Sequence, residues 1–161
     1  MGFLITNIMK ELNDLLLQIE NAIPHWEKQN TTISQANVGW QLDHSLLVIN
    51  GIIAQLSQSN PNHYQWRPNW KRTYIQLRNS IPRGKAKAPK PVRPVDTTSI
   101  EDLQNKLSTA KNNMALLEKL DKNSYFSHPY FGDLNLKATI WFLKLHTNHH
   151  LKIVNDIINK G

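Results

Sequence analysis

Apolar residues recur at helical spacing along four long stretches of the chain, and this periodicity constrains the fold more than any other feature. In the third stretch they follow one another at intervals of three and four residues, which places them on one face of an α-helix. They are Ile100, Leu103, Leu107, Ala110, Met114 and Leu117. A helix with one apolar face must bury that face against neighbouring elements.

The remaining helices follow from the same periodicity and from end signals such as Pro24 after the first stretch and Asn37 before the second. The predicted ranges are 3–22, 37–58, 98–120 and 134–159, with a short helix over 70–78. No stretch predicts a strand. The chain of 161 residues suits one domain spanning residues 1–161. The predicted fold is therefore an all-α four-helix bundle.

The connection between the second and third predicted helices is long and basic. Between Arg67 and Arg93 it carries nine lysines and arginines and no acid, in a chain whose net charge is +7. Four prolines between residues 82 and 94 favour an extended crossover. We interpret Arg83–Arg93 as a solvated basic crossover that the fold does not need and that can steer an anionic substrate. Nucleic acid is not the expected partner, because no DNA-reading or RNA-reading motif is present.

Composition excludes several classes of protein. The chain has no cysteine, which excludes disulfides, zinc–thiolate sites and thiol nucleophiles. No apolar run approaches the roughly 18–20 residues of a membrane span, and the N-terminal residues do not resemble a signal peptide. We therefore expect a cytoplasmic protein that does not bind membranes.

Three histidines, His146, His149 and His150, fall within five residues of the fourth predicted helix. His146 and His150 project about 40° apart, one turn above the other. They share a stripe with Thr139, Leu143, Ile153 and Ile157. Two imidazoles on a core-facing stripe need hydrogen-bond partners or a metal ion, because an unsatisfied buried polar group costs about 1–3 kcal/mol.

A divalent metal ion would be held by three histidines. His146 and His150 are favoured, and His149 could replace His150 at the i+3 position. The third candidate ligand is His44, which lies inside an apolar face of the second predicted helix. Three imidazoles leave a fourth coordination position open, as in catalytic zinc sites. Gln41 is a candidate site-lining residue, and Asp43 is either solvated or a support for the ligands.

The second predicted helix has an additional apolar face formed by Trp40, Leu47, Val48 and Gly51. A monomer would expose much of this face unless the aromatic stretch Tyr64–Tyr74 covered it. We therefore expect a homodimer.

Three segments, taken in order, resemble a known family. They are Val38–Asn50 around His44, His128–Gly132 with the sequence His-Pro-Tyr-Phe-Gly, and the helix with His146-x-x-His149-His150. Together they are similar to the DinB/YfiT-like superfamily of metal-dependent enzymes, and within it to an uncharacterised bacterial subgroup. The resemblance covers nearly the whole chain. Relatives often carry glutamine three residues after the last histidine, where this chain has Ile153.

The resemblance implies a four-helix bundle, often a homodimer, with a divalent metal on His44, His146 and His150. The metal would be Zn, Ni, Mn or Fe. The best understood members are S-transferases and isomerases that use low-molecular-weight thiols. The expected function is thus a metal-dependent transferase or hydrolase of small molecules. The alternatives are a non-catalytic dimeric module that binds a polyanion or nucleic acid through its basic crossover, and a protein whose histidines only form hydrogen bonds in the core.

Overall fold

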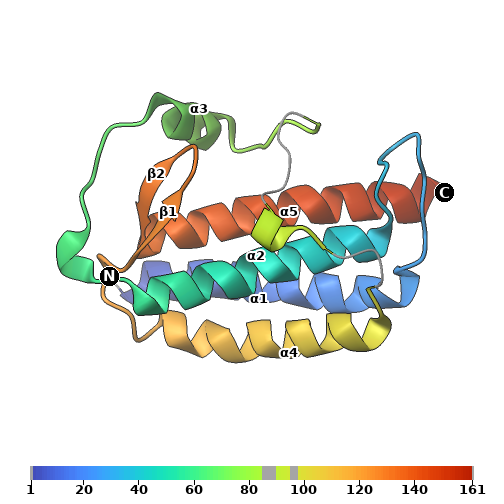
Figure 1. Cartoon of the computed structure of the whole chain (residues 1–161), viewed down its shortest axis with the longest axis horizontal. Helices are drawn as coiled ribbons and strands as arrows, with labels where there is room; N and C mark the ends of the chain where they lie inside the picture. The colour runs from blue at the N-terminus through green and yellow to red at the C-terminus, as the bar shows by residue number, and fades with distance from the viewer. Residues whose placement is uncertain (1, 85–89, 95–97, 161) are drawn as a thin grey trace.

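The computed structural model describes residues 2–84, 90–94 and 98–160. Four long helices lie side by side along the molecule: α1 (Gly2–Ala22), α2 (Val38–Gln58), α4 (Ile100–Leu117) and α5 (Leu136–Lys160) (Figure 1). The smaller elements are the helix α3 (Trp70–Arg78), the strands β1 (Tyr125–His128) and β2 (Gly132–Asn135), and the 3-10 turns η1 (Ile23–His25), η2 (Pro61–His63) and η3 (Lys90–Val92). The helices predicted from the sequence are confirmed to within a few residues at each end. No helix in the described part is both long and apolar enough to cross a membrane.

The start of α2 forms as the sequence predicts, and α4 also begins with a capped first turn. The Asn37 side chain accepts the amide proton of Trp40 at 2.8 Å and so caps α2. At α4 the Ser99 hydroxyl accepts the amide proton of Asp102, and the Asp102 carboxylate accepts that of Ser99. This reciprocal pair is a capping box, which satisfies amide groups that have no partner inside the helix.

The long helices enclose one apolar core. α2 packs on both α4 and α5, and α1 packs on α4 and α5. Fully buried side chains from all four helices meet there, including Leu16, Ile19, Leu46, Ile53, Leu103 and Val154. Because α2 contacts two helices, it has two buried faces, as its sequence indicated. On the second face Val48 is buried within the chain, and Trp40, Leu47 and Gly51 are half-buried, so a monomer exposes only part of this face. The homodimer itself stays a prediction.

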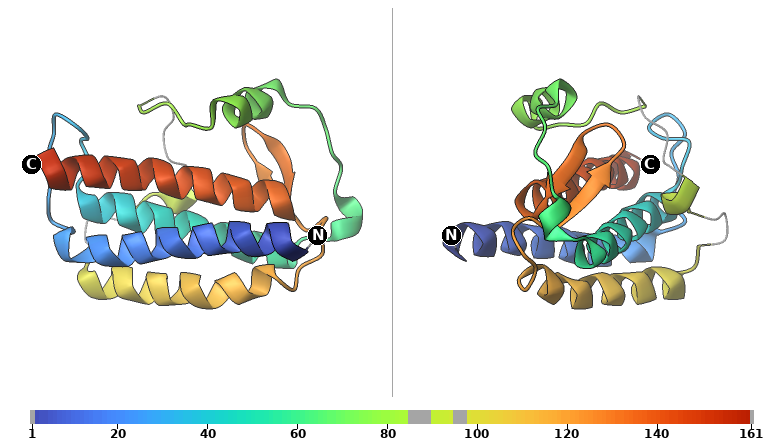
Figure 2. Two further views of the ribbon diagram at one scale, coloured as in Figure 1. Left: turned by 180° about the vertical axis from the view of Figure 1, so that it is seen from behind. Right: turned by 60° about the vertical axis from the view of Figure 1, so that its left-hand side comes forward.

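The expectation of an all-α protein is wrong at residues 125–135, where β1 and β2 form an antiparallel hairpin. Tyr125 pairs with Asn135 and His128 pairs with Gly132. Gly132 has a φ of 69°, a conformation that favours glycine. Each strand has four residues, too few for alternation to stand out in the sequence. The hairpin lies between α3 and the long helices in both views of Figure 2.

The prediction of a solvated crossover is wrong around Val92. Val92 packs against the core, Pro94 is buried, and η3 contacts α2. Arg83 forms an ion pair of 2.8 Å with Asp156 on α5. Lys85 and Lys87, which belong to the predicted crossover, lie outside the described residues. The described part of the crossover is therefore tied to α2 and α5.

Candidate metal centre

Three histidines from two helices converge at the centre of the molecule. α2 supplies His44, and α5 supplies His146 and His150 one turn apart. The ring centroids are 5.0 Å apart for His44 and His146, 4.7 Å for His44 and His150, and 4.5 Å for His146 and His150. One ring nitrogen from each residue lies within 4.8 Å of the other two. The predicted convergence of these three histidines is confirmed.

This spacing is near that of a metal site. Two nitrogens bound at about 2.1 Å to one tetrahedral ion lie about 3.4 Å apart, so small side-chain rotations bring the three histidines onto one ion. Three imidazoles are a donor set that suits zinc, iron and nickel.

Hydrogen bonds fix the orientation of two of the rings. Nδ1 of His44 lies 2.6 Å from the carbonyl oxygen of Val92, and Nδ1 of His150 lies 2.6 Å from Oε1 of Gln41. Both partners are oxygen acceptors, so each Nδ1 carries the proton and donates it. The lone pair of each ring is therefore on Nε2, the nitrogen that can bind a metal. Carbonyl partners of this kind orient histidines in metal sites.

His146 differs from the other two histidines. Its Nδ1 is buried and has no hydrogen-bond partner in the described part of the chain. Phe142 packs against the ring with centroids 5.6 Å apart, so the surroundings are apolar on that side. A buried ring nitrogen without a partner is uncommon and costs free energy. A histidine that serves as a metal ligand would account for this cost, which makes the residues present fit a metal ion.

Burial keeps all three histidines neutral. Desolvation lowers the pKa of His44, which the Val92 carbonyl and the Asp43 carboxylate only partly offset. Desolvation, followed by repulsion from neighbouring histidines, lowers the pKa of His146 and His150 well below the usual value. Metal binding therefore needs no proton to be displaced at neutral pH.

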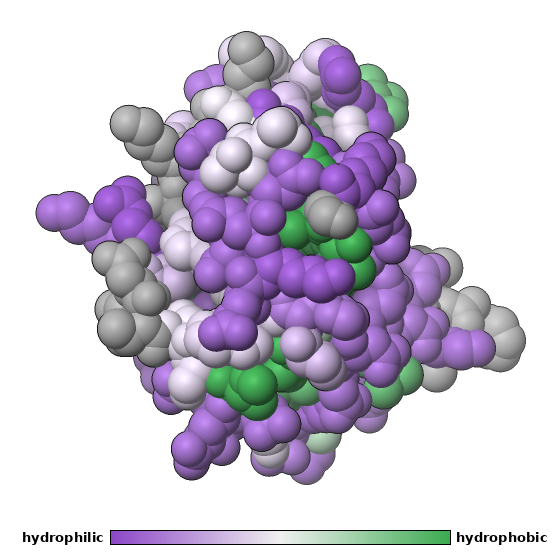
Figure 3. Space-filling model, turned by 90° about the vertical axis from the view of Figure 1, so that its right-hand side faces the viewer, coloured by the Kyte–Doolittle hydropathy of each residue, from purple (hydrophilic) through white to green (hydrophobic). Residues whose placement is uncertain are grey.

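Trp40 connects the triad to a hollow at the start of α2. Its ring stacks on His44 with centroids 5.1 Å apart and planes 23° from parallel. A hollow of about 400 Å³ lies beside Trp40, lined also by Trp26, Gln35, Asn37 and Thr98. The hollow is one tryptophan ring away from the three histidines. It lies at the end of the molecule shown in Figure 3, whose surface is mainly hydrophilic with small apolar areas.

Asp43 is fully buried, so the interpretation of this residue as solvated is wrong. Its carboxylate accepts hydrogen bonds from Lys106 Nζ at 2.6 Å and Thr98 Oγ1 at 2.7 Å. These contacts join Asp43, the residue before His44 on α2, to the start of α4. Asp43 thus holds the backbone that presents His44, and it is not among the three potential ligands.

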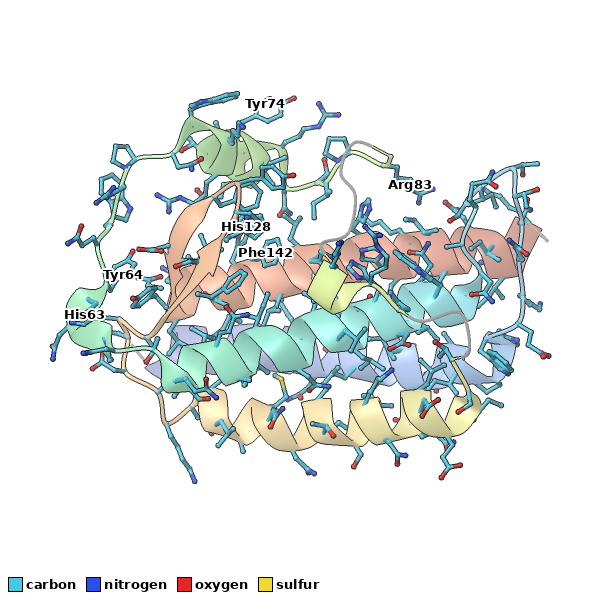
Figure 4. All side chains as sticks on the ribbon, viewed as in Figure 1. His63, Tyr64, Tyr74, Arg83, His128 and Phe142 are labelled. Carbon is cyan, nitrogen blue, oxygen red and sulfur yellow. The ribbon has the colours of Figure 1, made fainter. Side chains whose placement is uncertain are left out.

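The remaining histidines of interest have other partners. His149, the alternative to His150, lies outside the triad and bonds the carbonyl of Ile81, and burial lowers its pKa. Nδ1 of His128 accepts the amide protons of Tyr130 and Phe131, which closes the hairpin turn. Burial lowers the pKa of His128 to about 4. Figure 4 shows His128 and Phe142 between the hairpin and α5.

Sequence reasoning found the three candidate ligands but missed two of the groups that contact them. The carbonyl of Val92 is a backbone group, which carries no sequence signal at this position. Trp40 was assigned to a dimer face, although its position four residues before His44 indicates that the two rings share a helix face. Gln41 was correctly identified as lining the site.

Comparison of the chain with protein-family models, curated proteins and solved structures finds no match.

Proposed function

We propose that the protein is a metalloenzyme of the DinB/YfiT-like type, in which His44, His146 and His150 hold one divalent ion in a four-helix bundle. The observation that carries this proposal is the convergence of three neutral imidazoles, two of which have Nδ1 bonded to an oxygen acceptor and Nε2 free. The expected setting is a cytoplasmic homodimer that acts on a small molecule.

The bound ion would act as a Lewis acid that lowers the pKa of a water or thiol at its open position. The side chains then divide the other tasks. Gln41 and the Val92 carbonyl keep the ligand rings oriented. Trp40 covers one face of His44 and borders the hollow in which we place the body of the substrate. The resemblance supports a low-molecular-weight thiol as co-substrate, with S-transfer or hydrolysis as the reaction.

Metal analysis of the tag-free protein tests the ligand set. We expect about one divalent ion per chain after dialysis, and loss of this ion in His146→Ala. The matched control is His149→Ala, which removes a neighbouring histidine of α5 that lies outside the triad. A wild-type protein without bound metal, or equal metal content in the two variants, would contradict the proposal.

A cobalt-substituted protein tests the thiol. Addition of glutathione or 2-mercaptoethanol should produce a thiolate-to-cobalt absorption band in the near ultraviolet, because thiolate is a good ligand for an open position of this kind. The band should be absent in His146→Ala. Cobalt that binds to the wild-type protein without producing this band would count against a thiol substrate and leave the metal site intact.

A further inference from the structure

A second surface, separate from the histidine triad, lies on the residues just before α3, on α3 itself and at the tip of the hairpin. We call it the aromatic face and define it by Trp66, Trp70, Tyr74, Leu77 and Tyr130. Their exposed fractions are 67%, 75%, 50%, 84% and 54%, respectively. These five are among eight large hydrophobic side chains that are exposed in the described part of the chain. Such a concentration of exposed apolar side chains on α3 and its immediate neighbours marks a binding surface.

The structure holds this face outward by anchoring the polar side of α3. The Arg72 guanidinium is buried, and it donates to the carbonyl oxygens of Arg67 at 2.7 Å and Asp133 at 3.4 Å. Asn69 Nδ2 donates to the carbonyl oxygen of Tyr130 at 3.1 Å. Because Arg72 points from α3 toward the hairpin, the apolar stripe on the opposite side of α3 faces water. Figure 1 shows α3 on the far side of the hairpin from the long helices.

Basic side chains lie among the aromatic rings. Lys71 Nζ is 5.8 Å from the ring centres of both Trp70 and Tyr130. Arg78 donates to the hydroxyl of Tyr74 at 2.9 Å. The nearby carboxylate of Asp133 accepts a hydrogen bond from the Ser127 hydroxyl. Cations therefore lie beside Trp70, Tyr74 and Tyr130 of the aromatic face.

The connection that contains α3 carries the net charge of the chain, and four of its nine cations lie between residues 67 and 78. Residues 59–99 hold nine lysines and arginines and one acidic residue, whereas the rest of the chain holds ten lysines and arginines and eleven acidic residues. The net positive charge thus belongs entirely to the connection that contains α3. Such a distribution attracts an anionic partner. It disfavours a second copy of the chain, because a symmetric contact through the aromatic face would bring like charges together.

We propose that the aromatic face binds single-stranded nucleic acid, with bases stacked on Trp66 and Trp70 and phosphates neutralised by Arg67, Lys71 and Arg78. Cations beside exposed rings match a strand in which bases and phosphates alternate. A bilayer places charged headgroups above an apolar interior, so a surface whose cations contact its rings fits it less well. The missing sequence-reading motif is no obstacle, because stacking on aromatic rings tolerates any base.

Fluorescence anisotropy with labelled dT15 and rU15 tests this proposal. We expect saturable binding at 50 mM salt and about 20-fold weaker binding at 200 mM, since neutralising three phosphates of a single strand gives a salt slope of about −2. Trp66→Ala and Trp70→Ala should each weaken binding by about 5- to 150-fold, the range for loss of one stacked base. Both side chains are exposed, so the fold should be retained.

Matched controls separate this surface from general attraction. Lys71→Ser with Arg78→Ser should weaken binding and reduce the salt slope, whereas Lys119→Ser with Lys122→Ser, an equal charge loss on exposed residues elsewhere, should change it little. Leu17→Ala controls for loss of an exposed apolar side chain.

Several outcomes would overturn the proposal. One is no binding to either oligonucleotide at 50 mM salt. A second is equal loss of affinity in the two charge variants, or undiminished binding in both tryptophan variants. A third is binding to vesicles of phosphatidylglycerol without binding to the oligonucleotides. A fourth is a dimer that Trp70→Ala dissociates, again without oligonucleotide binding. Nucleic-acid binding should be unchanged in His146→Ala, so this test is independent of the metal centre.

Discussion

Replacing Gln41 with leucine should weaken metal binding at the triad by about 10- to 100-fold, the usual effect of removing a partner that orients a ligand. Gln41 is 4% exposed, so water cannot easily replace its oxygen. The bond that is lost joins Gln41 Oε1 and His150 Nδ1 at 2.6 Å. In Gln41→Leu the buried N–H of His150 has no partner, which costs about 1–3 kcal/mol. The metal-free ring can shift its proton or rotate to avoid this cost. The metal-bound ring cannot, because Nε2 must keep its lone pair, so the loss appears in the affinity.

Gln41→Glu provides the opposite perturbation. A carboxylate still accepts the proton of Nδ1 and adds a negative charge, which makes the ring a stronger ligand. Ser34 Oγ, which accepts a hydrogen bond from Gln41 Nε2 at 3.1 Å, can become the donor to the new carboxylate. The expected order of metal affinity is Glu, then Gln, then Leu.

Titration of zinc against a chromophoric chelator measures the three affinities. Ser45→Ala is the matched control, because Ser45 is buried on the same helix and its hydroxyl donates to the backbone carbonyl of Gln41. The reasoning is refuted if wild type binds zinc and Gln41→Leu binds it within twofold of wild type. Absence of zinc binding in the wild type would instead reject the metal site itself.

Three further predictions concern the buried ion pair, the hairpin histidine and the oligomeric state. Lys106→Met should cost about 3 kcal/mol of stability in urea unfolding, because it leaves the buried carboxylate of Asp43 without its cation. Asp43→Asn should cost only about 1 kcal/mol, since Lys106 is partly exposed, and equal costs for the two variants would contradict this reasoning. Because burial lowers the pKa of His128 to about 4, the unfolded chain binds more protons than the folded chain between about pH 6.5 and 4. The stability that the neutral His128 ring contributes is therefore lost as the pH falls through that window. The destabilisation by His128→Ala should therefore shrink by about 3 kcal/mol from pH 7.5 to pH 4, and a difference independent of pH would reject the low pKa. Light scattering should give about twice the 18.6 kDa of one chain if the homodimer forms, and a mass of one chain would exclude it.

The sequence predicts the long helices well because each carries a sustained apolar period and local end signals. Asn37 and Ser99 act within three residues of themselves, so their capping bonds are visible in the sequence. The hairpin was missed for the opposite reason. It depends on the pairing of four-residue strands and on His128 Nδ1 at the turn, which are tertiary features.

The candidate ligands were predictable because a histidine on an apolar helix face is conspicuous. Two at positions i and i+4 on α5 fix a common direction, and His44 was the remaining histidine inside an apolar stripe. The supports were less predictable. For Asp43 the sequence left a solvated and a supporting role open, because its partner Lys106 lies 63 residues away and pairing at that range leaves no local pattern.

The two ends of the basic connection explain why it was misread as a solvated crossover. The charge and proline content of the connection are properties of its side chains. Its contact with the triad is made by a backbone oxygen, which such properties do not predict. The Val92 carbonyl must lie within hydrogen-bond distance of His44 Nδ1, and this requires residues 90–94 to pack against α2. Because the same connection also carries α3 and the excess of cations, the long segment between α2 and α4 joins both proposed sites of the protein. At one end it supplies an acceptor that orients a ligand ring, and at the other it presents aromatic side chains to water. A deletion across the segment would therefore disturb both sites together, and only single substitutions such as Trp70→Ala and Gln41→Leu can separate them.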